Sequence, residues 1–269
     1  MRMPTVYIPH GGGPCFFMEW TMGPKDTWKP LETWLKEFPQ SLPKKPKALV
    51  VISAHWEESD IKVTSHPNPS LVYDYYGFPP ETYQLQWPAP GQPQLAAKIV
   101  SLLSGAGYTS SVDDSRGFDH GVFIPLKVSF PKADIPTVQV ALKKGLNPAE
   151  HIAIGAALAP LRDEGVLLIG SGMSYHNMRG FFTQGAYVHA HRFDTWLEQQ
   201  LIQPHELRKK SLANWSEAPS ARECHPREEH LLPLMVIAGA SAESSARKVF
   251  SDTVMGAKIS AFLFESEKI

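Results

Sequence analysis

Three apolar runs, each followed within a few residues by a histidine, constrain the fold of this chain more than any other feature. The runs are Thr5–Ile8, Leu49–Ala54 and Val166–Ile169, and the histidines that follow them are His10, His55 and His176. Continuous apolar runs of this length are typical of strands that are buried on both faces of a parallel sheet. In such sheets ligands bind beyond the carboxyl ends of the strands, so we expect the three imidazoles to share one edge.

Between these runs the hydrophobic periodicity predicts helices. We expect helices over 27–37, 92–106, 148–164, 186–201 and 228–239, further strands over 61–64 and 136–142, and an edge strand over 257–264. Prolines and aromatic residues are dense over 65–95, which predicts an ordered but irregular excursion. Alternating strands and helices indicate an α/β fold, with one domain over 1–269 and a mainly parallel or mixed sheet flanked by helices on both faces.

Composition excludes several classes of function. A net charge of -1 gives no electrostatic basis for binding nucleic acid or an anionic membrane. We also expect no membrane span, because no apolar run approaches the required length of about 18 residues, and no signal segment, because the N-terminus lacks a charged stretch followed by an apolar one. The only cysteines, Cys15 and Cys224, make no disulfide framework and fit a cytoplasmic protein. A metal site in this chain must therefore use nitrogen and oxygen ligands.

His10 and His55 are the strongest candidate metal ligands. Three glycines follow His10 and would let a ligand approach the backbone closely. Both histidines would bind a metal as neutral imidazoles. Glu57 and Glu58, just past His55, would either orient an imidazole ring or form a solvated acidic pair.

A third ligand is predicted near residue 230. His230 is expected in the first turn of the helix over 228–239, where Glu228 and Glu229 suit the positive end of the helix dipole. His225 lies five residues earlier, and the residues alone barely separate the two histidines.

Two further histidines are candidate pocket residues. His120 lies between Gly117 and Gly121, a spacing that indicates either close backbone approach at a pocket or a structural turn. His176 follows a Gly-Ser-Gly turn at 170–172. The aromatic residues of the 65–95 excursion either pack within a long loop or form a wall of the substrate pocket.

Five short motifs, taken together and in order, resemble those of class III extradiol ring-cleavage dioxygenases of the catalytic B-subunit type. The motifs are Pro9–Pro14, Ser53–Trp56, Gly117–Gly121, Tyr175–Asn177 and Glu229–Leu234. The connecting sequence is most similar to the DOPA-4,5-dioxygenase-like subgroup, and the resemblance covers nearly the whole chain.

The resemblance implies roles for the histidines. His10, His55 and His230 would hold one divalent metal, Fe(II) or Zn(II), which favours His230 over His225. His176 would be the acid/base beside the metal or a fourth ligand, and His120 a second catalytic histidine of the pocket. The substrates would be O2 and a small catechol-type, DOPA-like aromatic diol. His230 stands where the better-known dioxygenases have glutamate.

Two alternatives remain open at the level of sequence. A protein that bound only zinc would have no redox chemistry and would act as a hydrolase. A non-enzymatic metal-binding protein on the same fold is the second alternative, although it would not need His176. No arginine is assigned to a substrate carboxylate, although Arg116 and Arg179 lie near the motifs.

Overall fold

One eight-stranded mixed sheet forms the centre of the computed structural model, which describes residues 2–265. The strands lie in the order β4-β3-β5-β2-β6-β1-β8-β7. Their bounds are β1 Thr5–Pro9, β2 Ala48–Glu58, β3 Ile61–Thr64, β4 Ser110–Asp113, β5 Thr137–Lys143, β6 Val166–Gly172, β7 Ser245–Val254 and β8 Ala257–Glu265. The prediction of a mixed α/β sheet is confirmed.

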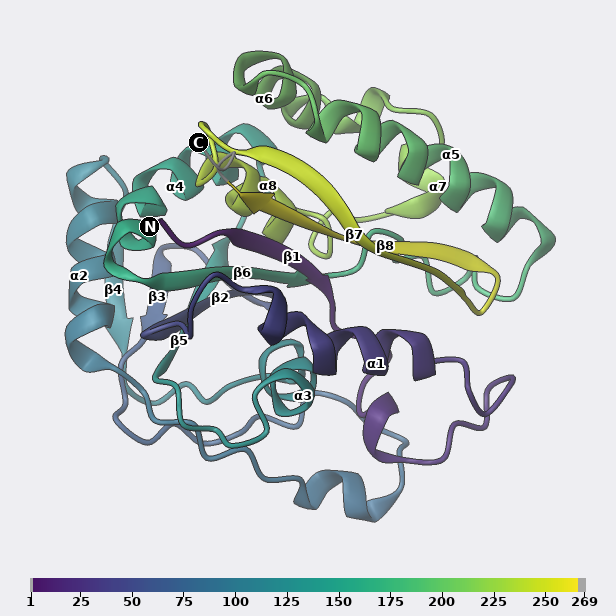
Figure 1. Ribbon diagram of the computed structural model, residues 1–269, viewed down its shortest axis with the longest axis horizontal. Coiled ribbons are helices and arrows are strands. Elements are labelled where there is room, and N and C mark those ends of the chain that lie inside the picture. The colour runs from purple at the N-terminus through teal and green to yellow at the C-terminus, as the bar shows by residue number, and fades with distance from the viewer. Residues whose placement is uncertain (1, 266–269) are drawn as a thin grey trace.

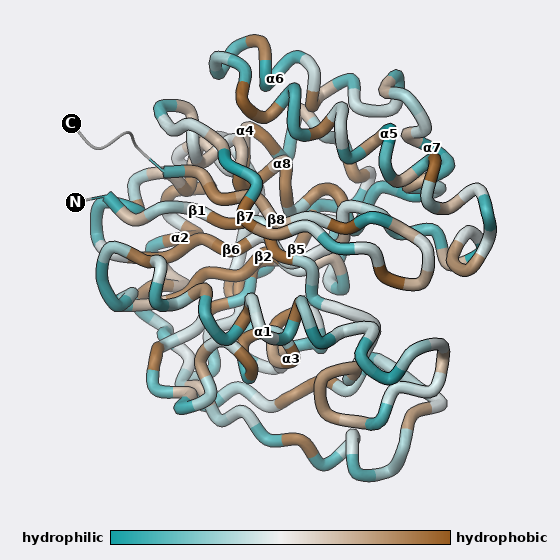
Figure 2. The backbone as a smooth tube through the Cα atoms, turned by 45° about the vertical axis from the view of Figure 1, so that its right-hand side comes forward, coloured by the Kyte–Doolittle hydropathy of each residue, from teal (hydrophilic) through white to brown (hydrophobic). Residues whose placement is uncertain are grey.

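The middle of the sheet is parallel. β5, β2, β6 and β1 pair in parallel, so their carboxyl ends face the same edge. Their apolar side chains are buried, as in Val50 and its register partner Leu168, because helices cover both faces. Figure 2 shows the same distribution, with the most hydrophobic backbone in the inner strands and α8.

The helices form a layer on each side of the sheet. Their bounds are α1 Lys29–Glu37, α2 Pro93–Gly105, α3 His120–Ser129, α4 Pro148–Leu158, α5 Gln184–Leu201, α6 His205–Ala213, α7 Ala221–Cys224 and α8 Leu232–Gly239. α4, α5, α6 and α8 lie on one face, and α1 and α3 lie on the other (Figure 1). Within residues 2–265, no helix is both long and apolar enough to cross a bilayer.

Two predicted helices begin or end elsewhere than expected, and proline explains both differences. The helix predicted over 148–164 ends at Leu158 and continues as a 3-10 helix over Ala159–Glu164, because Pro160 cannot continue the α-helical hydrogen bonding. The helix predicted over 228–239 begins only at Leu232, with Pro233 in its first turn, where a missing N–H costs nothing. His230 therefore lies in the turn before α8, and its predicted place inside the helix is wrong.

A strand forms at Ala257–Glu265, but the prediction that it lies at the edge of the sheet is wrong. β8 is an inner strand that pairs with β1 and with β7, and β7 forms the edge. β7 carries several charged side chains, which is how natural edge strands avoid further pairing, and its weak apolar pattern hid it from the sequence. The irregular excursion over 65–95 is confirmed, apart from one 3-10 helix at Pro80–Gln84.

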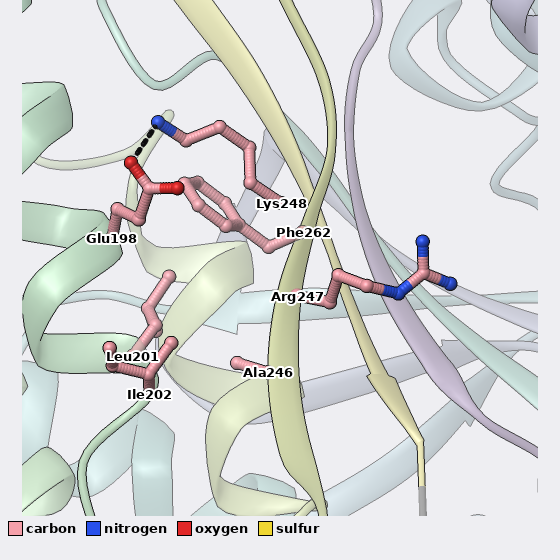
Figure 3. Close-up of a pocket in the computed structure, with 7 residues that line it drawn as sticks. All are labelled: Glu198, Leu201, Ile202, Ala246, Arg247, Lys248 and Phe262. Carbon is pink, nitrogen blue, oxygen red and sulfur yellow. Dashed lines mark hydrogen bonds and ion pairs between the residues drawn. The ribbon is translucent and has the colours of Figure 1, made fainter.

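An ion pair and an aromatic ring hold the β7 edge of the sheet against α5. Lys248 of β7 donates to Glu198 of α5 (2.6 Å) beside the ring of Phe262 from β8, whereas Arg247 points to the other side (Figure 3). Lys248 also pairs with the buried Asp194 (2.8 Å). The small pocket between these groups is lined by no histidine or cysteine of the described chain, and we assign it a structural role.

Candidate metal centre and active site

Three histidines from distant parts of the chain meet at the carboxyl edge of the sheet. His10 follows β1, His55 lies within β2, and His230 lies in the turn before α8. Their ring centroids are 4.9 Å apart for His10 and His55, 5.2 Å for His10 and His230, and 4.8 Å for His55 and His230. One ring nitrogen of each lies within 4.8 Å of those of the other two. The predicted convergence is therefore observed.

Hydrogen bonds select which nitrogen of the His10 ring and of the His230 ring faces the centre of this cluster. His10 Nδ1 donates to the Gly11 carbonyl (2.9 Å), and His230 Nδ1 donates to Glu229 Oε1 (3.0 Å). These bonds place the proton on Nδ1 and leave the Nε2 lone pairs free to bind a metal. His230 Nε2 is buried and has no hydrogen-bond partner in the described chain.

Burial keeps all three imidazoles neutral. It lowers the pKa of His10, His55 and His230 well below the usual value, and the neighbouring histidines lower it further. Neutral imidazole is the form that coordinates a metal, so no proton has to be displaced near neutral pH.

The cluster fits a divalent metal by a geometric test. His10 Nε2 and His55 Nε2 are 3.2 Å apart. Two nitrogens bound tetrahedrally at about 2.0–2.1 Å from one ion would be about 3.3–3.4 Å apart. A buried Nε2 atom with no partner, as in His230, would otherwise carry an uncompensated desolvation cost. A shared ion explains both observations.

His120 is held against this cluster by Asp74. The His120 ring lies 4.0 Å from that of His55, centroid to centroid. Asp74 Oδ1 accepts hydrogen bonds from His120 Nδ1 (2.8 Å) and from the His120 backbone N–H (2.9 Å). Partial burial raises the pKa of Asp74, but the hydrogen bonds from His120 outweigh it, so the pKa is lowered and Asp74 is ionised. His120 Nε2 is left as the nitrogen for a ligand.

His176 stacks on His230 and shares its carboxylate partner. The two rings are 3.3 Å apart between centroids and tilted by 16°. His176 Nδ1 lies 3.3 Å from Glu229 Oε1, the same oxygen that His230 contacts. Burial raises the pKa of Glu229, but the contact with His176 outweighs it, so the carboxylate is ionised. His176 groups with Glu229 and His230, and not with the nitrogens of His10 and His55.

Asp74 and Glu229 therefore orient the rings, a role that the sequence suggested for Glu57 and Glu58. Glu57 instead forms a bidentate ion pair with Arg227 (2.6 Å for both bonds), and Glu58 accepts from Trp56 Nε1 (3.1 Å). Asp74 is the only acidic residue between residues 61 and 80 and is flanked by tyrosines, but this pattern does not indicate that its side chain reaches His120.

His225 is a core residue. Its ring is buried between Phe193 and Trp215, and Nε2 donates to the Ser174 carbonyl (3.0 Å). Burial lowers the pKa of His225 to about 3. Of the two candidates for the third ligand, only His230 lies in the histidine cluster, whereas His225 is packed in the core.

The predicted close approach around His120 is observed. A methyl group on Gly121 would overlap Ser53 Oγ and lie 3.0 Å from His55 Cδ2. The glycines after His10 are also crowded, but by protein side chains: Cys15 limits Gly11, and Phe78 limits Gly13, which has a φ of 55°. Because these glycines have no side chains, the neighbouring aromatic rings can pack against them. The glycines also line the cavity described next.

All five histidines line one cavity of about 570 Å³. Beyond them its walls are largely aromatic and methionine side chains, and four residues of the 65–95 excursion, Asp74, Tyr75, Tyr76 and Phe78, belong to it. This confirms the prediction that the excursion contributes a pocket wall. The side chains of Met173 and Met178 were missed, since nothing in that sequence separates a pocket wall from ordinary packing.

Comparison with known proteins places this site in context. The family described as "Catalytic LigB subunit of aromatic ring-opening dioxygenase" matches residues 4–263. A Beta vulgaris protein named 4,5-DOPA dioxygenase extradiol is 39% identical over 254 residues, which are 93% of this chain and 91% of that protein. The dioxygenase tasH of Hapsidospora irregularis is 33% identical over 275 residues, 95% of this chain and 83% of the other.

A solved structure has the same fold. The crystal structure of an uncharacterized protein from Escherichia coli K12 matches with a TM-score of 0.78 and 30% sequence identity, covering 98% of this chain and all of the other. The match extends over the sheet and over the segments that carry the histidines.

Proposed function

This chain belongs to the family of the catalytic LigB subunit of aromatic ring-opening dioxygenases, and we propose that its histidine cluster is the metal centre at which a catechol-type ring is cleaved with O2. Family membership makes the chain an extradiol dioxygenase, an oxidoreductase. The observation that carries the proposal is the meeting of three neutral imidazoles, two of them buried and that of His55 half-buried, in one cavity with His120 and His176. Membership favours this activity over a zinc hydrolase and over a non-enzymatic metal-binding protein.

His10, His55 and His230 would hold the metal through Nε2. When bound, the ion supplies Lewis-acid stabilisation of the ionised diol and a coordination site for O2. Imidazole ligands suit both iron and zinc. Because Zn(II) has no redox chemistry, Fe(II) is the functional ion of this proposal.

His176 is the acid/base of the proposal. With Nδ1 donating to Glu229, its Nε2 carries a lone pair that can take a proton from a substrate hydroxyl. The ionised Glu229 would then stabilise the imidazolium, which can later return the proton as a general acid. His176 groups with Glu229 and His230 but not with the nitrogens of His10 and His55, which supports this role over that of a fourth ligand.

His120 would bind a substrate hydroxyl group through a hydrogen bond. Asp74 keeps the His120 proton on Nδ1, so Nε2 can accept a hydrogen bond from a hydroxyl group. The apolar wall of the cavity limits water around these groups, which strengthens each of their electrostatic interactions.

A colour assay tests the proposal. The metal-free protein is loaded anaerobically with Fe(II) and mixed with DOPA, simple catechols and oxygen, and we expect a yellow ring-opened semialdehyde. The absence of colour with every catechol tested would count against dioxygenase activity.

His176→Ala separates the two roles of His176. If it is the acid/base, the variant loses turnover but keeps nearly the wild-type metal content. Loss of metal together with turnover would instead make His176 a ligand. His189→Ala is the control, because the His189 ring forms a hydrogen bond with Ser220 (2.9 Å) and does not line the cavity.

Residues 1–269 would act as one catalytic domain, since the single sheet takes strands from both ends of the described chain. A reducing, cytoplasmic location is part of the proposal. It is supported by the two buried, free cysteines, Cys15 and Cys224.

A further inference from the structure

The substrate-binding part of the cavity beyond the histidines has an unusual charge composition. Among the described residues that line it, none is lysine or arginine, and the only carboxylate is Asp74. Asp74 is already engaged by two hydrogen bonds from His120. A substituent carboxylate that extends away from the histidines would therefore meet no lysine or arginine side chain among the described residues of this cavity.

The nearest arginines are held elsewhere. Arg116 donates to the His55 carbonyl (3.3 Å) and to buried Asp119 (3.4 Å), behind His55. Arg227 is paired with Glu57 and Glu229. Arg179 is exposed and does not line the cavity. Neither arginine noted near the sequence motifs thus faces the cavity.

The polar atoms of the wall are mostly used within the protein. Trp20 Nε1 donates to the Met22 carbonyl (2.8 Å), and the Tyr75 hydroxyl donates to the Thr82 carbonyl (2.6 Å). Trp28 Nε1 has no hydrogen-bond partner in the described chain, but it is a neutral donor. The desolvation free energy lost when an anion is buried against such a wall would be far larger than the free energy gained from one hydrogen bond to a neutral donor.

The same apolar character extends to the rim of the cavity. Met178 is 72% exposed and Phe182 is 60% exposed, although both are large apolar side chains. The Phe182 backbone N–H donates to the Met255 carbonyl (2.8 Å), which fastens this loop to the turn between β7 and β8. Exposed apolar surface that is continuous with a pocket is typical of a ligand-binding site.

We propose that this enzyme acts on catechols whose ring substituent is uncharged and apolar, such as an alkyl or aryl group, in preference to catechols that carry a carboxylate. The inference rests on the proposed function, because it assumes that the diol lies at the histidines. The substituent then extends along Trp20, Trp28 and Phe181 towards Met178 and Phe182.

Three catechols of matched length test the inference: 4-propylcatechol with a neutral end, 3-(3,4-dihydroxyphenyl)propanoate with an anionic end, and dopamine with a cationic end. We expect KM for the propanoate to exceed that for propylcatechol by about tenfold or more, with a smaller difference in kcat. Binding of the same three compounds to the metal-free protein, followed by tryptophan fluorescence, should give the same order. Equal or tighter binding of the propanoate would overturn the inference, and so would tightest binding of dopamine.

A charge introduced at the rim provides the reciprocal test. Met178→Lys should lower KM for the propanoate several-fold relative to propylcatechol. Val188→Lys adds the same charge to an exposed position of α5 outside the cavity and should leave the ratio unchanged. An unchanged ratio in Met178→Lys would count against the inferred position of the substituent. If none of the three catechols is cleaved, the proposed function itself fails, whereas cleavage of all three with equal KM overturns only the inference.

Discussion

Replacing Asp74 by asparagine tests whether a carboxylate that is not one of the proposed metal ligands sets the reactivity of His120. Asp74 Oδ1 accepts both the His120 ring N–H (2.8 Å) and the His120 backbone N–H (2.9 Å). Asparagine has nearly the same shape but removes the negative charge and offers only one acceptor oxygen. The change therefore weakens the orientation of His120 without opening a cavity.

The expected effect follows from these two contacts. A hydrogen bond to a charged group contributes about 1.5–3 kcal/mol, against about 0.5–1.5 kcal/mol for a neutral pair. Weakening the ring contact by about 1.4 kcal/mol corresponds to about a tenfold loss in rate. His55 Nδ1 is 3.8 Å from Asp74, too far for a hydrogen bond, so metal binding should change much less than turnover.

The assay is ring opening at saturating Fe(II), with the metal content of each sample measured in parallel. We expect kcat/KM of Asp74→Asn to fall about tenfold with metal content nearly unchanged. Asp134→Asn is the matched control, because Asp134 forms a surface ion pair with Lys45 far from the cavity in the fold. Turnover within twofold of the wild type, or loss of metal in place of turnover, would refute the assigned role of Asp74.

Three further changes probe other parts of the account. Glu229→Gln should weaken metal binding about 10–100-fold, because Glu229 orients His230, and an unchanged affinity in a metal titration would contradict this. Gly121→Ala should cost about 1–3 kcal/mol of unfolding free energy in urea, since its methyl group would overlap Ser53; a wild-type urea midpoint would show that the site can relax. In the folded protein the pKa of His225 is about 3, so its ring stays neutral at pH values at which the same histidine in the unfolded chain is protonated. Below pH 6.5 the unfolded chain therefore binds more protons than the folded protein. The unfolding free energy of the metal-free wild type should therefore fall by up to about 1.4 kcal/mol per pH unit more steeply than that of His225→Gln between pH 6.5 and 4, and parallel pH profiles would exclude this.

The sequence predicts the inner part of the fold because burial on both faces leaves a clear pattern. The apolar runs of β1, β2 and β6 are unmistakable, and the histidines near their carboxyl ends follow from the parallel topology. α3 was missed because it is buried almost all round and has Pro125 within it, so it shows no helical periodicity. β4, α6 and α7 were missed because they are short or polar.

The supporting carboxylates could not be predicted in the same way. Asp74 reaches His120 only because the irregular 65–95 excursion folds back against the start of α3, a path that no local pattern specifies. From the sequence, Glu229 was expected to interact with the helix dipole. The helix begins three residues later, however, and the Glu229 side chain contacts His176 and His230. Positions set by loop geometry require the structure.

Anomalous diffraction from crystals loaded with Fe(II) under anaerobic conditions tests whether His10, His55 and His230 share one ion. We predict a single strong peak bonded to the three Nε2 atoms, at about 2.0–2.2 Å from each. A peak between His176, Glu229 and His230 instead, or none near His10 and His55, would contradict the account.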